Sequence, residues 1–185
     1  GDETSEVLNG EGGNDTVYAA AGNNTVDGGQ GDDAIYAGDG NNFVIGGEGN
    51  DLIKLGDGNN SVDGGSGNNQ IILGNGNNAI SVGDGNNLIT SGSGDDSITA
   101  GSGNNAIVAG EGNNSIALNG GVNDIISGSG NDAVIALAGV NTINVGEGNN
   151  QVVLTDGQNT VTAGSGADRI TTRGGVNLLT VGEGS

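Results

Sequence analysis

Residues 28–54 read GGQGDDAIYAGDGNNFVIGGEGNDLIK, three consecutive segments of nine residues with the same order of glycine, polar and aliphatic positions. The period continues without an insertion from Asp2 to Val181, where it forms twenty repeats. Counted from Asp2, glycine fills the third position of every repeat from Gly13 to Gly175 and returns at Gly184. Strict repetition at a short period is typical of solenoids, in which each repeat packs against its neighbours along the chain.

Each repeat has the pattern of one short strand and one turn. β-branched residues indicate the strand, and the Gly-Asn-Asn or Gly-Asn-Asp segment before it indicates the turn. The density of glycine excludes a helix. The seventh position is always aliphatic, and we expect these side chains to point inward: Leu8, Val17, Val26, Ile35, Val44, Ile53, Val62, Ile71, Ile80, Ile89, Ile98, Ile107, Ile116, Ile125, Val134, Ile143, Val152, Val161, Ile170 and Leu179. Residues two apart on a strand share a face, so many apolar ninth positions should also point inward: Leu55, Leu73, Val82, Leu118, Val145, Leu154 and Val181.

One strand and one turn give half a coil, so two repeats, or 18 residues, should complete one coil. We therefore predict an all-β fold, a parallel β-roll or β-solenoid of about ten coils that spans residues 1–185 as a single domain. With about 4.8 Å between neighbouring strands, the rod would be on the order of 50 Å long.

The composition agrees with local stacking and not with a globular core. Of 185 residues, 42 are Gly and only three are aromatic (Tyr18, Tyr36 and Phe43), and the chain contains no Cys, His, Met, Pro or Trp. A disordered chain of low complexity would be compatible with this composition. The aliphatic residues in strict register favour a folded rod instead.

The charge of the chain limits its partners. Three basic residues (Lys54, Arg169 and Arg173) oppose 23 acidic ones, which gives a formal net charge of −20. Such a surface repels nucleic acid and anionic membranes and attracts cations. No run of about 18 apolar residues could span a membrane, so we expect neither nucleic acid nor a membrane span. The N-terminal Gly1-Asp2-Glu3-Thr4 has no initiating Met and no signal-peptide pattern, which favours a processed product or a fragment. An acidic chain without thiols favours an extracellular or cell-surface location.

Two segments, Gly28 to Tyr36 and Gly46 to Lys54, match the nonapeptide GGxGxDxUx in full. The chain therefore resembles the calcium-binding repeats of secreted RTX (repeats-in-toxin) proteins. In that family, Asp carboxylates of two stacked turns and backbone carbonyl groups enclose a calcium ion. The resemblance implies metal ligands at Asp15, Asp33 and Asp51, with about two to three calcium ions in the N-terminal coils. Turn capping is the alternative role for these three residues.

Calcium-type turns are expected over residues 10–69 of one edge, because asparagine replaces the metal-binding Asp in most other repeats. The replaced positions are Asn24, Asn42, Asn60, Asn69, Asn78, Asn87, Asn105, Asn114, Asn123, Asn141, Asn150, Asn159 and Asn177. An amide offers both a donor and an acceptor, so stacked Asn residues could form a ladder that requires no ion. We therefore expect residues 70–185 to be Asn-ladder coils largely without a calcium motif. On the opposite edge, Asp96, Asp132 and Asp168 have amide neighbours, which favours charge dilution or weak cation binding.

Beyond residue 119 the first edge changes again, because Val122, Val140, Gln158 and Val176 should form one row. A partly apolar row would fit either packing against a partner or a different type of turn. The chain offers little for catalysis, since it contains neither His nor Cys to activate a nucleophile. We therefore do not expect an enzyme.

These features favour a secreted structural or adhesive module, such as a filament or stalk subunit, whose N-terminal coils are locked by calcium. We expect it to associate with itself. Head-to-tail contact would use the coil that ends at Val181-Gly182-Glu183-Gly184-Ser185 without a polar cap. Lateral contact would use outward aliphatic residues: Ile72, Leu88, Val108 and Ile126 on one sheet, and Phe43, Ile45, Ile135 and Val153 on the other.

Two alternatives remain open. The first is an ice-binding solenoid, but its outward threonine residues would be interrupted by Asp27, Lys54, Asp63 and Asp124. The second is the RTX tail of a secreted enzyme or toxin, which would fold when it meets calcium outside the cell. The asparagine replacements argue against this alternative, because a chain that folds without calcium would lose that switch.

Overall fold

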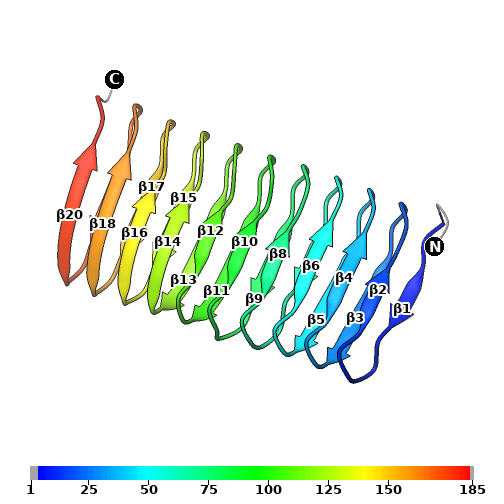
Figure 1. Cartoon of the computed structure of the whole chain (residues 1–185). Coiled ribbons are helices and arrows are strands. Elements are labelled where there is room, and N and C mark those ends of the chain that lie inside the picture. The colour runs from blue at the N-terminus through cyan, green and yellow to red at the C-terminus, as the bar shows by residue number, and fades with distance from the viewer. Residues whose placement is uncertain (1–3, 184–185) are drawn as a thin grey trace.

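The computed structural model describes residues 4–183, in which every regular element is a strand. Twenty strands form two parallel sheets of ten, which confirms the predicted parallel β-solenoid. The coils stack side by side from the N-terminus to the C-terminus and form one rod (Figure 1). Asp2, Gly184 and Ser185, on which parts of the expected repeat pattern fall, lie outside the described residues. Within those residues there is no helix of the length and hydrophobicity needed to cross a membrane.

The strands alternate between the two sheets along the chain. The first sheet contains β1 (Val7–Asn9), β3 (Thr25–Gln30), β5 (Phe43–Glu48), β7 (Ser61–Asp63), β9 (Ala79–Val82), β11 (Ser97–Ser102), β13 (Ser115–Gly120), β15 (Ala133–Ala136), β17 (Gln151–Leu154) and β19 (Arg169–Thr172). The second sheet contains β2 (Thr16–Tyr18), β4 (Ala34–Ala37), β6 (Leu52–Leu55), β8 (Gln70–Ile72), β10 (Leu88–Thr90), β12 (Ala106–Val108), β14 (Val122–Ile126), β16 (Val140–Asn144), β18 (Gln158–Ala163) and β20 (Val176–Val181). Paired residues such as Ile89 and Ile107 are 18 positions apart, so each coil has the predicted length.

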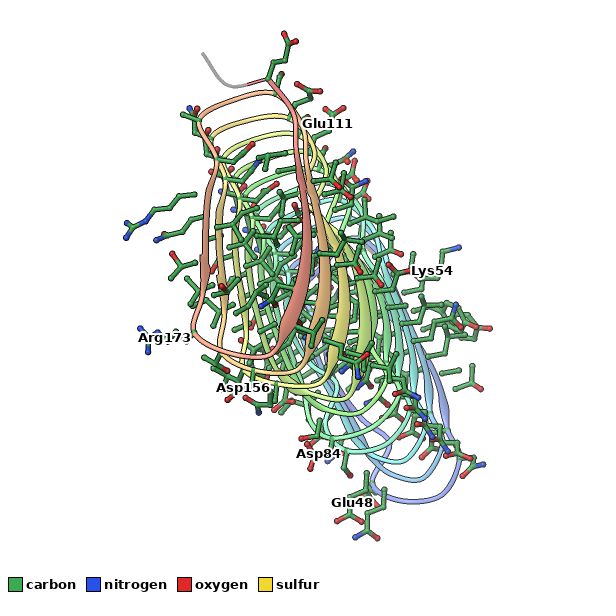
Figure 2. All side chains as sticks on the ribbon, turned by 90° about the vertical axis from the view of Figure 1, so that its left-hand side faces the viewer. Glu48, Lys54, Asp84, Glu111, Asp156 and Arg173 are labelled. Atoms are coloured by element: carbon green, nitrogen blue, oxygen red, sulfur yellow. The ribbon has the colours of Figure 1, made fainter. Side chains whose placement is uncertain are left out.

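Two edges join the sheets. The first edge holds the turns that lead from an odd-numbered strand to the next even-numbered strand, and the second edge holds the turns that lead back. Charged side chains point outward at both edges and on the faces: Figure 2 shows Glu48, Asp84 and Asp156 at the first edge, Glu111 at the second and Lys54 on the second sheet. Most of the negative charge therefore lies on the outside of the rod, whereas Asp33, Asp51, Asp96 and Asp132 are buried.

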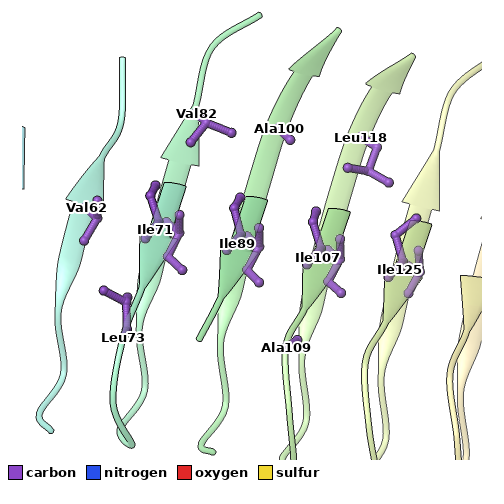
Figure 3. Packing of buried hydrophobic residues seen from close by; sticks show 14 of the residues in the cluster. Val62, Ile71, Leu73, Val82, Ile89, Ala100, Ile107, Ala109, Leu118 and Ile125 are labelled. Carbon is purple, nitrogen blue, oxygen red and sulfur yellow. The ribbon is translucent and has the colours of Figure 1, made fainter. Parts of the chain in front are cut away.

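Aliphatic side chains from both sheets fill the interior. Ile71, Ile89, Ile107 and Ile125 stack in successive coils of the second sheet, and residues of the first sheet face them (Figure 3). The predicted ninth-position residues are also buried: Leu55, Leu73, Val82, Leu118, Val145 and Leu154. The prediction is wrong for the last described coil, in which Leu179 is 41% exposed and Val181 is 54% exposed. Only one described coil packs against these two residues.

Glycine at the third position satisfies two requirements of the turn. All third-position glycines from Gly13 to Gly175 have positive φ, between 79° and 145°. This backbone conformation costs residues with a side chain more than it costs glycine. A Cβ at Gly112 would also collide with the carbonyl oxygen of Gly94 in the preceding coil. The expected special conformation at this position is therefore confirmed, and close stacking of the turns adds a second constraint.

Neighbouring residues on β12 test which side chains form the core. Ile107 is 1% exposed and points inward, whereas Val108 is 38% exposed and points outward. Ile107→Ala should lower the free energy of unfolding by about 2–5 kcal/mol, because it leaves a cavity between stacked coils. Val108→Ala should lower it by less than about 1 kcal/mol. Chemical denaturation monitored by circular dichroism measures both, and equal losses would contradict the assignment of the core.

Candidate metal centre

Asp15, Asp33 and Asp51 lie in one column at the first edge, as the sequence predicts. Each residue directly precedes a strand of the second sheet, namely β2, β4 and β6. The backbone N–H of Asp15 donates to Asp33 Oδ1 at 2.8 Å, and that of Asp33 donates to Asp51 Oδ1 at 2.9 Å. One oxygen of each of the latter two carboxylates is thus held by the preceding coil.

The second oxygen of each of these three carboxylates has no partner. Oδ2 of Asp15, Asp33 and Asp51 is buried and accepts no hydrogen bond. Asp33 and Asp51 are only 2% exposed, so water does not surround their carboxylates. A buried acceptor without a partner loses its hydration without compensation. Such an oxygen is available to a partner that the chain does not supply, and Asp96 and Asp168 at the second edge each have one as well.

Glycine lets other oxygens approach these carboxylates closely, because it has no side chain. A Cβ at Gly28 would lie 2.5 Å from the carbonyl oxygen of Gly46 and 2.6 Å from Asp33 Oδ2. Both oxygens therefore border the same space, and both are acceptors. Calcium is a hard cation that binds carboxylate and backbone carbonyl oxygens, so this pair fits a calcium ion.

The arrangement recurs one coil before and one coil after. A Cβ at Gly10 would lie 2.9 Å from Asp15 Oδ2 and close to the carbonyl oxygen of Gly28. At Gly46, a Cβ would lie 2.7 Å from Asp51 Oδ2 and 2.9 Å from the carbonyl oxygen of Gly64. Each of the three acids thus faces a carbonyl group of the following coil.

The column of paired oxygens ends at Gly64. A Cβ there would lie 2.8 Å from Val82 Cγ1 and 3.1 Å from Ile71 Cδ1, so aliphatic groups have replaced the oxygens. The acid is replaced as well, because Asn69 occupies the corresponding position. Residues 4–183 contain no group of three or more acidic side chains that could hold a metal ion by themselves. Carbonyl groups would therefore supply a necessary part of any calcium site at this edge.

Buried Asn residues form ladders through the other coils, and Asn42 shows how they are satisfied. Its backbone N–H and its Nδ2 donate to Asn60 Oδ1 at 3.1 Å and 3.0 Å. The same Nδ2 also lies 3.1 Å from the carbonyl oxygens of Gly38 and Gly40 in its own turn. Asn87 and Asn105 repeat the side-chain contact at the first edge. The predicted Asn ladder is confirmed.

A second, outer ladder was not predicted. The residue before each buried Asn or Asp is usually also Asn or Asp, and it is exposed. Here the direction is reversed, because Asn59 N–H donates to Asn41 Oδ1 at 2.8 Å and Asn77 N–H donates to Asn59 Oδ1 at 2.8 Å. The repeated pairs of polar residues in the sequence were the signal for this ladder.

The acids of the second edge are part of the inner ladder. Asn78 N–H donates to Asp96 Oδ1 at 2.8 Å, and Asp96 N–H donates to Asn114 Oδ1 at 3.0 Å. Asn114 N–H then donates to Asp132 Oδ1 at 2.8 Å. Asp168 accepts from Asn150 in the same way. Each of these acids has amide neighbours, as predicted.

The row at the C-terminal part of the first edge also exists. Val122 pairs with Val140, Val140 with Gln158, and Gln158 with Val176. These residues begin the longer strands β14, β16, β18 and β20, so the turn before them differs from the earlier turns. Val122 and Val176 are exposed.

Burial changes the ionisation of three acids. It raises the pKa of Asp51 above its ordinary value of 3.8, and the charges of Asp33 and Asp32 raise it further, although the backbone N–H of Asp33 opposes the shift. Burial also raises the pKa of Asp96 and Asp132, and hydrogen bonds from neighbouring serine and asparagine residues oppose it.

Comparison with known proteins identifies one family model. The model described as RTX calcium-binding nonapeptide repeat matches residues 1–35, 36–71, 45–80, 72–107, 81–116, 99–134, 118–152 and 153–185. These segments together include the whole chain. No curated protein and no solved structure gave a significant match.

Acid should stabilise the chain when a chelator removes calcium. Because the folded-state pKa values of Asp51, Asp96 and Asp132 are raised above 3.8, folding favours the protonated carboxyl groups. Their contribution to stability is complete below the unfolded-state pKa and is lost as the pH rises through the folded-state values. Thermal melting in EDTA should therefore give a higher Tm near pH 4 than near pH 7.

The lower net charge in acid would also reduce repulsion, so a matched control is needed. A variant with Asp51→Asn, Asp96→Asn and Asp132→Asn should show a weaker dependence of Tm on pH, because it lacks the buried titrating groups. Asn in place of the exposed Asp63, Asp124 and Asp156 removes the same charge and should leave the dependence largely intact. A wild-type Tm that rises with pH in EDTA would contradict the assignment.

Proposed function

Because the chain belongs to the RTX calcium-binding nonapeptide repeat family, we propose that it is a non-catalytic structural module with about two to three calcium ions in its N-terminal coils. Asp15, Asp33 and Asp51 would supply the carboxylates. The observation that carries this proposal is the buried, unpartnered Oδ2 of Asp33, which lies with a carbonyl oxygen of the next coil against the position that a Cβ of Gly28 would occupy. In the remaining coils, Asn ladders would stabilise the stacked turns without an ion.

A comparison of the two edges supports this division. At the first edge, Asp15 Oδ2 and the carbonyl oxygen of Gly28 border one space, and neither atom can donate a hydrogen bond. Asn78 and Ser91 occupy the corresponding positions at the second edge, and there Asn78 Nδ2 donates to the Ser91 carbonyl oxygen at 2.9 Å. Two facing acceptors require a cation or a proton between them, whereas a donor and an acceptor satisfy each other.

The proposed role is a stiff stalk, adhesive or filament subunit outside the cell or at its surface. Continuous register through ten strands in each sheet gives a rod with little freedom to bend between repeats. Weak calcium sites are typical of extracellular modules, which meet high calcium concentrations. With a net charge of −20, the rod would bind divalent cations more readily than phosphate-rich partners.

Self-association is the second part of the proposal. Val108 pairs with Ile126 on the neighbouring strands β12 and β14, and both are exposed; Leu88 on β10 is exposed as well and pairs with Ala106 in the adjacent row of the second sheet. Among the described residues, β19 and β20 pair on one side only. Their free edges could accept a further coil, either of the same chain or of a second copy.

Ice binding has less support. Thr142 pairs with Thr160, and Thr162 pairs with Thr180, on the outer face of the second sheet. Asp124 and Leu178 interrupt the first of these rows, and Asn144 interrupts the second.

Calorimetric titration should detect about two to three calcium ions per chain. Asp33→Asn should remove at least one of them, because Asp33 lies at the centre of the acidic column. Asp63→Asn removes the same charge from an exposed strand position and should leave the number of ions unchanged. A wild-type chain that binds no calcium would exclude the proposed role of the three acids, and about one ion per turn would exclude the role of the Asn ladders.

The location of the residues that lose protection from hydrogen exchange when calcium is removed distinguishes local from global stabilisation by calcium. Hydrogen exchange in EDTA should accelerate in residues 10–69 and remain slow in the central Asn-ladder coils, because solenoid repeats unfold locally. Global loss of protection in EDTA would show that calcium holds the whole rod.

Filament formation should depend on the screening of charge. Sedimentation and electron microscopy should show larger assemblies at high salt or with calcium, because either one reduces repulsion between rods that each carry −20. Val108→Glu should weaken lateral association, and Ser97→Glu on the opposite sheet provides a control of equal charge. Monomers under all these conditions would contradict self-association.

A further inference from the structure

The residue five positions before each buried acid or amide differs with the identity of that group. Gly10, Gly28 and Gly46 precede the three acids of the first edge, and Ser91 and Ser127 precede Asp96 and Asp132. Ala, Leu or Val precedes most buried Asn residues, as Leu55 precedes Asn60. Gly or Ser therefore precedes these five carboxylates, whereas among the buried Asn residues only Asn69 is preceded by such a residue, Gly64.

Glycine at these positions is not a requirement of the backbone. Gly29 and Gly47 have positive φ, but Gly28 and Gly46 do not, so residues with a side chain could adopt their conformation. A side chain at Gly28 would come between Asp33 Oδ2 and the carbonyl oxygen of Gly46 in the following coil. The constraint on this residue is space beside the carboxylate.

Serine hydroxyl groups contact the corresponding oxygens at the second edge. Ser91 Oγ donates to the carbonyl oxygen of Ala109, 18 residues later, at 3.0 Å, and Asp96 Oδ2 itself is buried without a hydrogen-bond partner. Ser127 Oγ donates to Asp132 Oδ2 at 2.6 Å. The same two kinds of oxygen lie against the position of a Cβ at Gly28: the carbonyl oxygen of the next coil and a carboxylate oxygen of the acid five residues later. Both serine residues are 0% exposed, so their side chains are enclosed at this place.

We propose that this residue decides whether the acid five positions later binds calcium: glycine leaves room for the ion, and serine replaces the ion with a hydroxyl group. The inference rests on the proposed function for the first edge and extends it to the second. Asp96 and Asp132 are then carboxylates without calcium, and Ser91 and Ser127 determine the specificity. Asp168 follows Ala163, which provides a methyl group but no donor, and its Oδ2 is buried without a partner although the residue as a whole is half-buried.

The alternative is that stacking of acids alone decides where calcium binds. At the first edge three acids lie in successive coils, whereas Asn114 separates Asp96 from Asp132 at the second edge. Asn114→Asp would create the same succession of three acids without changing the ninth positions. A matched variant would combine Asn114→Asp with Ser91→Gly, Ala109→Gly and Ser127→Gly.

The two variants have the same acids and differ only at positions 91, 109 and 127, which lie five residues before those acids. Calorimetric titration and melting with and without EDTA should show no additional ion for Asn114→Asp alone. The variant with the three glycine substitutions should bind at least one additional ion and gain a calcium-dependent rise in Tm. The proposal is overturned if Asn114→Asp alone gains the ion, or if the glycine variant folds and gains none.

A reciprocal variant decides the question if the glycine variant does not fold. Gly28→Ser should bind one calcium ion fewer than the wild-type chain, and retention of the wild-type number would overturn the proposal. Circular dichroism establishes that the variant is folded, and Ser127→Ala provides a control that should not change the number of ions. If the wild-type chain bound no calcium, the proposed function would fail, while the two Asn114→Asp variants would still test the effect of glycine.

Discussion

The central constraint on this protein is that each buried polar group in a turn must be satisfied largely by the turns 18 residues before and after it. The inner column shows the consequence, because Asn42 and Asn60 pass hydrogen bonds from one coil to the next. A side chain with both a donor and an acceptor can continue such a column without limit. A carboxylate cannot, because it accepts at both oxygens, and each Asp therefore leaves one acceptor that needs a partner from elsewhere.

Buried polar groups in the rod meet this lack of hydrogen-bond donors in three ways. Asparagine supplies its own donor, Ser127 supplies a hydroxyl group to Asp132 Oδ2, and the unpartnered oxygens of Asp33 and Asp51 fit a calcium ion. All three occur in the same register, because the aliphatic interior and the glycine turns do not change between them. Ion-dependent and ion-independent coils can therefore share one fold, and the side chains of each turn determine which kind it is.

Much of the fold follows from the sequence because the period is fixed. The neighbour of any residue is the residue 18 positions away, so the column of Asp15, Asp33 and Asp51 and the row that begins at Val122 were both predictable. The direction of each hydrogen bond was not, because it depends on the orientation of the peptide groups in the turn. The inner ladder donates toward later residues and the outer ladder toward earlier ones, as Asn42 and Asn59 show. Exposure of Leu179 was missed because a periodic pattern does not distinguish a coil with one packed neighbour from a coil with two.

The two adjacent glycines of the RTX pattern are explained by different physical constraints in this chain. Gly29 has positive φ, and a Cβ there would collide with the carbonyl oxygen of Glu11, so the turn itself requires glycine. Gly28 has an ordinary φ, and its missing side chain leaves space beside Asp33 Oδ2. The first glycine of the pair can therefore be replaced without loss of the turn, as Ser91 and Ser127 demonstrate at the second edge. Replacement of the carboxylate by Asn removes the need for that space, and aliphatic residues such as Val82 and Leu118 then extend the core into it. Turns with Asn in place of the acid thus bury additional apolar surface, which stabilises the coil and keeps the register of the rod.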